Sequence, residues 1–521
     1  MTGNLSNAGI QKKVFIAWYV LLAYIAGSLY FNYIDSADTI QYLELAKEYS
    51  KNGLFEHPNA YWSPLLSWLI APFCWFKTNP VHALKLIQLS CGFILYIQVL
   101  NRLSTLKLPQ SLNIPLSLVF PVIILSYALL YGTPDLLFLV LLMAIVKRLP
   151  QFTESIKKSI VLGLLGALLY FSKAAGFYLF ILATGLVQLY HAFVIKNKNS
   201  LAPYLSCMGI FILISGVWIF SLSKHEHHLT ISSAGKYNLN ILSPAINPDL
   251  YAELQHPISK DTLMAPDPVC GSSSWMQPDK YQLNNWSPFS SSENSCWYGK
   301  NILRNFKSIR SFYFGLDAGT LIIVVLFLLF LFKKQAVLQL FKGYKYELIT
   351  AISVSLFYCL VFVQPRYLWL NEVLLLLMAA STTRLIYQYK KTPAYLFLTA
   401  VLLLSIRVPL KEMGANADRG KALKVFIEQN ALHGNLASVH AQQQDDYTST
   451  NLVAYYTHSN YFGRLSADKN KEEENRLLLK KFHIDYVLTF EPSGFNEVLK
   501  KCALHTIYSP ETGITLYHIV N

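Results

Sequence analysis

The sequence predicts a polytopic α-helical membrane protein with a small α/β domain after its last membrane helix. Hydrophobic residues make up 53% of the 521 residues and charged residues 14%, which gives a mean hydropathy of +0.33. Apolar runs recur along the chain, and several approach the ~20 residues that cross the hydrocarbon core as a helix. After residue 408 these runs stop. We therefore expect a transmembrane domain, 1–408, and an extracytoplasmic domain, 409–521.

The apolar runs predict about eleven membrane-spanning helices. The first run follows Lys12 and Lys13 and is typical of an uncleaved signal anchor. Three runs, 134–148, 159–173 and 393–408, are shorter than the rest. The predicted spans are 14–34, 82–101, 113–131, 134–148, 159–173, 175–195, 203–222, 314–332, 347–363, 367–386 and 393–408.

The distribution of Lys and Arg predicts the orientation of these spans. With the N-terminus in the cytoplasm, nearly all basic residues of the short loops fall on the cytoplasmic side, in agreement with the positive-inside rule. An odd number of spans then places the C-terminal domain outside the cytoplasm. This topology accounts for most of the formal net charge of +14, and no basic stripe accompanies it. We therefore expect contacts with membrane lipids and none with nucleic acid.

Two predicted outer loops, 35–81 and 223–312, are too long to be simple connections. In the first, 38–52 has the pattern of an amphipathic helix ended by Gly53, and the apolar stretch 62–76 is typical of an interfacial helix. The second is rich in Ser, Pro, Asn, Trp and Tyr. We predict that it folds over a cavity as a lid or an acceptor-binding element.

Cys270 and Cys296 share the second outer loop, on the side of the membrane where oxidation is permitted. A disulfide between them would close a loop of about 27 residues and stabilise the fold by about 3–4 kcal/mol. Two free thiols are the alternative. We favour the disulfide.

The C-terminal domain is predicted from segments that alternate between helix-like and strand-like patterns. It lies beyond the last apolar run, so we place it outside the membrane. The expected helices cover 422–430, 471–482 and 495–502, and the expected strands cover 436–440, 486–490 and 514–519.

Four ionisable residues at the ends of apolar spans fall on the outer side of this topology: Asp38, Asp135, Lys173 and Arg366. Charges at the edge of a bilayer are costly and usually functional. Because these four share one side, while most other short-loop cations lie on the opposite side, we predict a cavity on the non-cytoplasmic face. Its mixture of acids and cations fits an anionic, lipid-linked substrate.

The two acids each have a functional and a structural interpretation. Asp38 follows the first span and could act as a general base on an acceptor hydroxyl. Alternatively it caps the next helix, with Gln41 completing a capping box. Asp135 could orient the acceptor or, with Asp38, a metal ion. Alternatively it belongs to a helix start, with Thr133 as the cap and Pro134 in the first helical position.

The two cations are predicted to bind phosphate. Arg366 lies at a helix start marked by Pro365, and arginine binds phosphate through two parallel hydrogen bonds. An ion pair with an acid is the alternative. Lys173 would share the phosphate unless its side chain only snorkels to water. The run from His225 to His228 lacks the spacing of a helical metal site and is interpreted as a polar loop.

These segments together resemble the GT-C superfamily of glycosyltransferases, in particular the bacterial branch with lipid A aminoarabinose transferase and protein O-mannosyltransferases. The resemblance covers roughly residues 14–386, and its main part is Ala37 to Ala46, which includes Asp38 and Tyr42. The supporting segments are Tyr61-Trp62-Ser63-Pro64-Leu65, Thr133-Pro134-Asp135-Leu136, Ser172-Lys173-Ala174-Ala175-Gly176 and Arg366-Tyr367.

The resemblance implies an inverting transfer of a sugar from a polyprenyl-phosphate donor, at the periplasmic face of a bacterial inner membrane. Asp38 matches the family's catalytic acid and Asp135 its second acid, and Arg366 matches the basic residue near the donor phosphate. The acceptor is a lipid, a glycan or a protein. The substrate-binding set that we predict is Asp35, Tyr42, Lys173, Arg366 and Tyr367.

Two departures from the family concern metal use and donor identity. Thr39 stands where the family often has an acid, and Trp62-Ser63 stand where related sequences carry charged residues. A polyprenyl phosphate is already a competent leaving group, so we expect no required cofactor. A divalent metal at Asp38 and Asp135 stays open.

Two other functions fit parts of the sequence. A transporter or flippase for lipid-linked sugars predicts charges near mid-span, and no internal repeat supports it. A non-catalytic membrane assembly protein predicts that Asp38 and Asp135 are dispensable. The position of the charged residues at outer span ends favours the enzyme.

Overall fold

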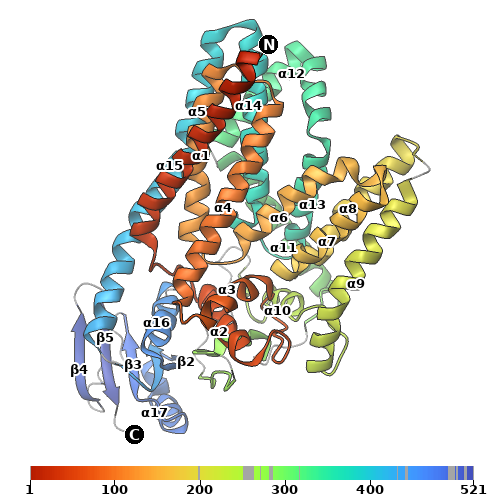
Figure 1. The fold of residues 1–521 in the computed structure, drawn as a ribbon. Helices are drawn as coiled ribbons and strands as arrows, with labels where there is room; N and C mark the ends of the chain where they lie inside the picture. The colour runs from red at the N-terminus through yellow and green to blue at the C-terminus, as the bar shows by residue number, and fades with distance from the viewer. Residues whose placement is uncertain are drawn as a thin grey trace.

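The computed structural model describes residues 2–197, 200–249, 263–269, 271–280, 286–315, 317–430, 432–439, 444–490, 499, 503–509 and 513–519. Most of this length is helical, and many of the long helices run side by side in a bundle (Figure 1). The N-terminus lies at one end of the bundle. The C-terminus and a small sheet lie at the other end.

Eight described helices are long and apolar enough to cross a membrane. The other three predicted spans correspond to the shorter helices α6 (Asp135–Arg148), α7 (Ile156–Ser172) and α13 (Lys345–Leu360). The prediction of a helical membrane protein is thus confirmed, whereas the count of eleven spans is not. The eight stretches are Ile10–Tyr30 of α1 (Thr2–Tyr30), Pro80–Thr105 (α4), Gln110–Leu130 (α5), Ala175–Val194 (α8, Ala175–Leu189, with η2, Tyr190–Val194), Leu201–His225 (α9), Ala318–Gly343 of α12 (Asp317–Gly343), Pro365–Tyr389 (η7, Pro365–Leu368, with α14, Trp369–Tyr389) and Lys391–Gly414 of α15 (Lys391–Gln429).

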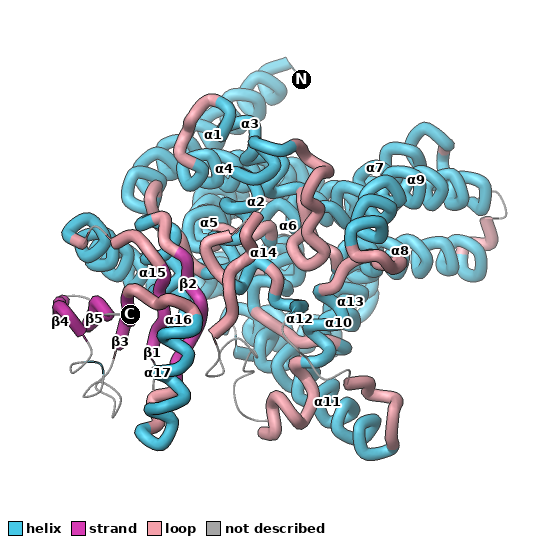
Figure 2. The backbone as a smooth tube through the Cα atoms, turned by 90° about the horizontal axis from the view of Figure 1, so that it is seen from below, coloured by secondary structure: helices cyan, strands magenta, loops and turns pink. Residues whose placement is uncertain are grey.

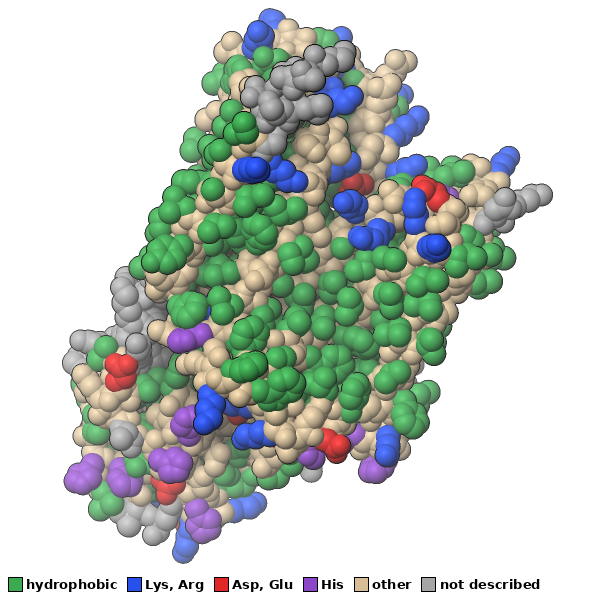
Figure 3. All heavy atoms as spheres, in the orientation of Figure 1, with side chains coloured by type: hydrophobic (Ala, Val, Ile, Leu, Met, Phe, Trp, Pro, Cys, Tyr) green, Lys and Arg blue, Asp and Glu red, His purple; other side chains and the backbone are tan. Residues whose placement is uncertain are grey.

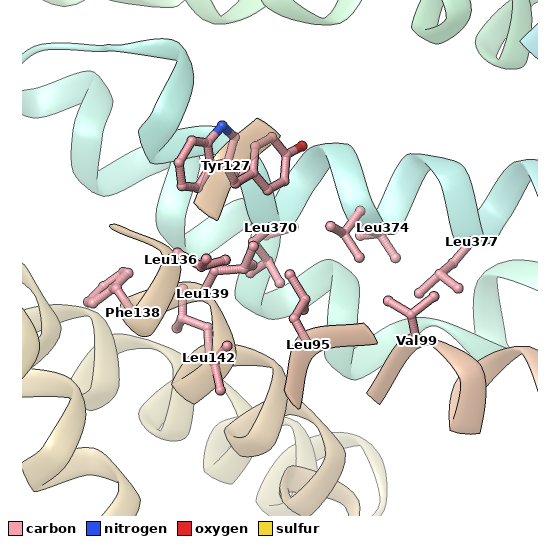
Figure 4. Packing of buried hydrophobic residues seen from close by; sticks show 14 of the residues in the cluster. Leu95, Val99, Tyr127, Leu136, Phe138, Leu139, Leu142, Leu370, Leu374 and Leu377 are labelled. Carbon is pink, nitrogen blue, oxygen red and sulfur yellow. The ribbon is translucent and has the colours of Figure 1, made fainter. Parts of the chain in front are cut away.

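The centre of the bundle is built by α4, α5, α6 and α14 (Figure 4). Leu95 and Val99 of α4, Leu139 of α6 and Leu374 of α14 are all buried there. Two thirds of the apolar stretch in α5 and in α14 is buried (67% in each), against 17–28% in α1, α9, α12 and α15. The second group therefore presents most of its surface to lipid. Because α14 is central, close packing holds the residues at its outer end in place.

The surface of the molecule has the polarity that a membrane protein requires. Figure 3 shows Lys and Arg side chains gathered at the end that carries the N-terminus and a broad hydrophobic belt below them. Histidine side chains appear mainly at the opposite end, around the C-terminal domain, whereas acidic side chains appear toward both ends. This asymmetry agrees with the positive-inside pattern of the sequence.

The first outer loop folds into α2 (Ala37–Asn52) and α3 (Leu65–Trp75), which pack against each other at the outer end of the bundle. In α2, apolar residues such as Ile40 and Leu43 are fully buried. Gly53 ends this helix with φ 102°, a conformation that favours glycine. The amphipathic and interfacial helices predicted for this loop are both present, the second in a shorter form.

The second outer loop contains two helices that its composition did not predict, α10 (Ala234–Asn240) and the longer α11 (Ser292–Gly315). Asparagine side chains point into the protein from α11: Asn301 Nδ2 donates to Leu242 O at 3.4 Å, and Asn305 Nδ2 donates to Val361 O at 2.9 Å. Trp297, Ile302, Phe306 and Ile309 recur at helical spacing along α11, so the sequence carried an amphipathic pattern that the prediction for this loop did not use.

The structure describes only one of the two cysteines in the predicted disulfide. Cys296 lies near the start of α11, is exposed and is free among the described cysteines. Cys270 lies outside the described residues. The pairing of these two cysteines stays a prediction.

The C-terminal domain has a five-stranded mixed sheet with strand order β2-β1-β3-β5-β4. β1 pairs in parallel with β2 and β3, while β5 pairs antiparallel with β3 and β4. The strands are β1 (Asn435–Val439), β2 (Asn460–Leu465), β3 (Tyr486–Thr489), β4 (Ala503–Ser509) and β5 (Ile514–Ile519), and the helices are α16 (Gln444–Thr457) and α17 (Glu472–Lys481).

The predicted strands 436–440, 486–490 and 514–519 correspond to β1, β3 and β5, and the helix 471–482 corresponds to α17. The segment 422–430 is not a separate helix, because it is the end of α15. The segment 495–502 lies almost wholly outside the described residues. The pattern missed β2, β4 and α16.

Candidate active site

The structure brings the four predicted ionisable residues together at the end of the bundle that carries the C-terminal domain. Lys173 Nζ lies 2.7 Å from Asp135 Oδ1, and Arg366 Nη2 lies 3.1 Å from Asp38 Oδ2. Arg366 Nε lies 3.7 Å from Asp135 Oδ2, so this guanidinium contacts both acids. Asp38 and Arg366 are 328 positions apart in the sequence. The fold therefore assembles one charged cluster, Asp38, Asp135, Lys173 and Arg366, from distant segments.

Asp38 lies in the first turn of α2, and its carboxylate faces Arg366. The residue that caps this helix is Ser36, whose Oγ accepts a hydrogen bond from the Thr39 amide at 3.4 Å. The alternative that Asp38 and Gln41 form the cap is therefore wrong. Gln41 Nε2 donates instead to Ala37 O and to Ser273 Oγ, at 3.2 Å each. With 26% of its side chain exposed, Asp38 is the more accessible of the two acids.

Asp135 is almost fully enclosed, with 4% of its side chain exposed. It is the first residue of α6, and Pro134 rather than Thr133 occupies the cap position, so the predicted cap assignment is wrong by one residue. The Thr133 hydroxyl donates to Asp135 Oδ2 at 2.6 Å. Both carboxylate oxygens are thus occupied by donors, as a buried charge requires.

The Lys173 ammonium faces Asp135 within the charged cluster and does not snorkel to water. It ends α7, and its Nζ lies 4.1 Å from the centroid of the Tyr367 ring, in a cation–π contact. Tyr367 stacks on Tyr358 with ring centroids 4.5 Å apart. This predicted substrate-binding tyrosine therefore forms part of the wall beside both cations.

Arg366 lies in η7, just before α14. Its Nε donates to Gln364 Oε1 at 2.8 Å, and its Nη1 makes a long contact of 3.5 Å with Thr133 Oγ1. The predicted alternative of an ion pair with an acid is present in this state. A guanidinium has five N–H donors, so Arg366 retains capacity for a further anion.

Asp35 joins the start of α2 to the α5–α6 turn through hydrogen bonds. Its Oδ1 accepts hydrogen bonds from Thr39 Oγ1 at 2.7 Å and from the Gly132 amide at 2.9 Å, and its Oδ2 accepts one from Ser36 Oγ at 3.0 Å. A Cβ at position 132 would overlap the Thr39 side chain, so this close approach needs glycine. These contacts hold the α5–α6 turn against α2. The predicted role of Asp35 in substrate binding stays a prediction.

Tyr42 lies one helical turn after Asp38 and is buried. Its ring meets Trp62 edge-on, with centroids 5.4 Å apart. Burial raises the pKa of the Tyr42 phenol well above its usual value, and the charges of Asp38 and Asp135 raise it further. The Tyr42 phenol is therefore protonated and lies one helical turn from Asp38.

Trp275 is the main site residue that the sequence reasoning missed. Its indole Nε1 donates to Asp38 Oδ1 at 2.9 Å, from the 3₁₀ helix η5 (Ser274–Met276) in the second outer loop. No periodicity marks this residue in the sequence. The available signal was a tryptophan within a run of serines, in a loop that was predicted to cover the cavity.

The possible divalent metal at Asp38 and Asp135 stays a prediction. Within the described residues, no group of three or more His, Cys, Asp and Glu side chains is placed to hold an ion. Arg366 contacts both Asp38 and Asp135, so a cation from the protein already neutralises these two acids. In the other candidate, His225 to His228, His225 Nδ1 contacts Glu226 Oε1 at 3.1 Å in an exposed loop.

No family model matches the sequence, and no curated protein matches it. Solved structures match nearly the whole chain. ArnT from Cupriavidus metallidurans, a lipid A aminoarabinose transferase, superimposes in the apo state with a TM-score of 0.56 at 11% identity, covering 99% of this chain and 98% of ArnT. The fold is that of the GT-C glycosyltransferases.

Two further GT-C structures extend this similarity. ArnT bound to undecaprenyl phosphate has a TM-score of 0.52 at 11% identity, covering 97% of each chain. The oligosaccharyltransferase AglB from Archaeoglobus fulgidus, in complex with an inhibitory peptide and a dolichol-phosphate, has a TM-score of 0.52 at 11% identity, covering 97% of this chain and 74% of AglB. The resemblance stated from the sequence is therefore confirmed at the level of the fold.

Proposed function

We propose that this GT-C-fold protein is an integral membrane glycosyltransferase that moves a sugar from a polyprenyl-phosphate donor to an acceptor outside the cytoplasm. The observation that carries the proposal is the cluster in which Arg366 contacts Asp38 and Asp135, and Lys173 contacts Asp135. The solved complexes of ArnT with undecaprenyl phosphate and of AglB with dolichol-phosphate support a lipid phosphate as the ligand.

The two cations would hold the donor phosphate. Lys173 and Arg366 lie at outer helix ends, where a lipid tail can stay in hydrocarbon while the phosphate and sugar enter a polar pocket. Asp135 stays charged between them and orients both side chains. Its carboxylate is almost fully buried and contacts Lys173, Thr133 and Arg366, so we assign it to positioning and not to proton transfer.

Asp38 would act as the base. The acceptor hydroxyl oxygen forms a bond to the anomeric carbon as the bond from that carbon to the phosphate oxygen breaks, and the phosphate leaves with the electron pair. Asp38 takes the hydroxyl proton. Attack from the face opposite the phosphate inverts the anomeric centre. In the resting state Arg366 pairs with Asp38, so a phosphate that attracts Arg366 also frees the base.

The test measures release of undecaprenyl phosphate from a panel of undecaprenyl-phosphate-linked hexoses, pentoses and aminosugars, with purified protein in lipid nanodiscs. Asp38→Asn should lower turnover by about a hundredfold or more, because a positioned base contributes that much. Glu44→Gln is the matched control, since Glu44 is a carboxylate of the same helix that pairs with Lys47. The proposal fails if Asp38→Asn turns over like wild type, or if the wild-type protein moves intact donor across a bilayer and releases no lipid phosphate.

A further inference from the structure

Trp275 contacts the oxygen of Asp38 that Arg366 leaves open. Arg366 Nη2 binds Oδ2, and the Trp275 indole binds Oδ1. We propose that Trp275 is a positioning residue for Asp38, and that residues 271–280, here called the strap, link the C-terminal domain to the catalytic base. This inference rests on the proposed function, in which Asp38 accepts the proton.

The strap is seated firmly against the first outer loop. Asn59 Nδ2 donates to Met276 O at 3.0 Å, and Trp62 Nε1 donates to the same oxygen at 3.1 Å. Gln41 of α2 donates to Ser273 Oγ, one helical turn from Asp38. The strap side chains Ser273, Trp275 and Met276 are buried, with 0%, 5% and 0% exposure. The indole is therefore held in place relative to α2.

The same strap is bonded to the C-terminal sheet. The amide of Tyr461 in β2 donates to Ser272 O at 2.7 Å, and Ser273 forms a parallel bridge with Tyr461. β2 is an edge strand of the sheet, and the strap covers part of that edge beside Leu263 and Met264, which also pair with β2. Tyr447 of α16 also packs on Trp275, with ring centroids 6.3 Å apart. The C-terminal domain therefore contacts both the strap backbone and the Trp275 ring.

The chemistry of an indole suits this role. It has one N–H donor and no acceptor, so it cannot take the substrate proton itself. Bound to Oδ1, it fixes the plane of the carboxylate and directs Oδ2 toward Arg366. When Arg366 turns to the donor phosphate, Oδ2 is the oxygen that is freed and meets the acceptor hydroxyl. Base catalysis depends on such alignment.

Trp275→Phe removes the indole N–H and keeps an aromatic ring. We expect kcat to fall by about tenfold, since a hydrogen bond to a charged group is lost, while KM for the lipid-linked donor stays within twofold. Trp297→Phe is the matched control, because its indole, also from the second outer loop, donates to Leu242 O at 2.8 Å and not to Asp38. A loss confined to general loop packing would affect both variants alike.

A second measurement does not depend on turnover. Water-soluble carbodiimide should label Asp38 faster in Trp275→Phe than in wild type or Trp297→Phe, because Oδ1 is uncovered. If Trp275→Phe yields no folded protein, Ser273→Ala carries the test: it removes the Gln41 contact, and we expect a smaller change in the same direction.

Unchanged kcat and labelling in Trp275→Phe, or equal effects in Trp297→Phe, overturn the inference. Wild-type-like turnover of Asp38→Asn overturns the proposed function instead. In that case the labelling rates still decide whether the strap holds Asp38.

Discussion

Arg366, in the C-terminal half of the chain, receives both acidic partners from the N-terminal half: Asp38 from the first outer loop and Asp135 from the start of α6. Its planar group donates from Nη2 to one acid and lies close to the other through Nε. An ammonium is a single point charge and cannot span two carboxylates in this way. The geometry of the side chain therefore matters beyond its charge.

Replacing Arg366 with Lys should weaken binding of undecaprenyl phosphate by about tenfold or more, although the charge is kept. Native mass spectrometry of the protein with titrated undecaprenyl phosphate gives the affinity. Arg102→Lys is the control, because Arg102 pairs with Glu347 at 2.7 Å at the opposite end of the bundle. Binding by Arg366→Lys within twofold of wild type would rule out a bidentate phosphate site.

Asp38 and Asp135 should differ in how much each contributes to the free energy of unfolding. Asp135→Asn leaves Lys173 and Arg366 buried with less compensation and should lower the free energy of unfolding by about 3 kcal/mol. Asp38→Asn should cost much less, because 26% of that side chain is exposed and screened by water. Unfolding in the same detergent compares the two variants. Equal losses of stability would show that the two acids do not differ in this way.

At the scale of elements, α4 determines where the α5–α6 turn lies. Lys85 Nζ donates to Leu129 O at 2.7 Å, and Gln88 Nε2 donates to Thr133 O at 2.8 Å. These side chains are one turn apart on α4 and fully buried, with 1% and 0% exposure. The turn held by these two hydrogen bonds leads directly to Asp135, the first residue of α6.

Gln88→Leu should therefore lower activity more than Gln98→Leu. Both glutamines lie on α4 and donate to backbone carbonyls, but Gln98 Nε2 reaches Val140 O, at 3.2 Å, in the middle of α6. We expect kcat to fall by about five- to tenfold in Gln88→Leu, the equivalent of one displaced hydrogen bond, and to stay near wild type in Gln98→Leu. Similar kcat values in the two variants would show that the turn does not need this brace.

At the scale of the whole molecule, the charge asymmetry predicts which end faces the cytoplasm. In a background with the seven native cysteines replaced by serine, a membrane-impermeant maleimide added to intact spheroplasts should label Phe289→Cys, whose site in the second outer loop is 82% exposed. It should label Ser104→Cys, at the exposed end of α4, only after permeabilisation. The reverse pattern would contradict the proposed orientation.

Hydropathy predicted most of the membrane helices because a chain in lipid satisfies its backbone hydrogen bonds within each helix. The same topology made Arg366 and Lys173 stand out, since they are cations on the side where cations are rare. Local patterns could not show that these side chains meet the two acids. That arrangement depends on packing between helices far apart in the sequence.

Other features were not predicted correctly from local patterns. In α11, the buried side chains include Asn301 and Asn305, which hydropathy alone assigns to the surface. The contact of Trp275 with Asp38 depends on the strap and on β2, segments whose positions no local pattern encodes. The caps at Ser36 and Pro134 differ by one or two residues from those expected, because several residues near each helix start satisfy the same local rules.

Helix α15 continues without a break from the bilayer to the neighbourhood of the sheet, over Lys391–Gln429. No flexible tether separates the two domains there, so the rotation of the sheet about that axis is determined by helical phase. Each added or deleted residue would turn the sheet by about 100° and shift it by about 1.5 Å. A change of length within this stretch should therefore break the register of β2 with Ser272 and Ser273 unless the strap moves with the sheet.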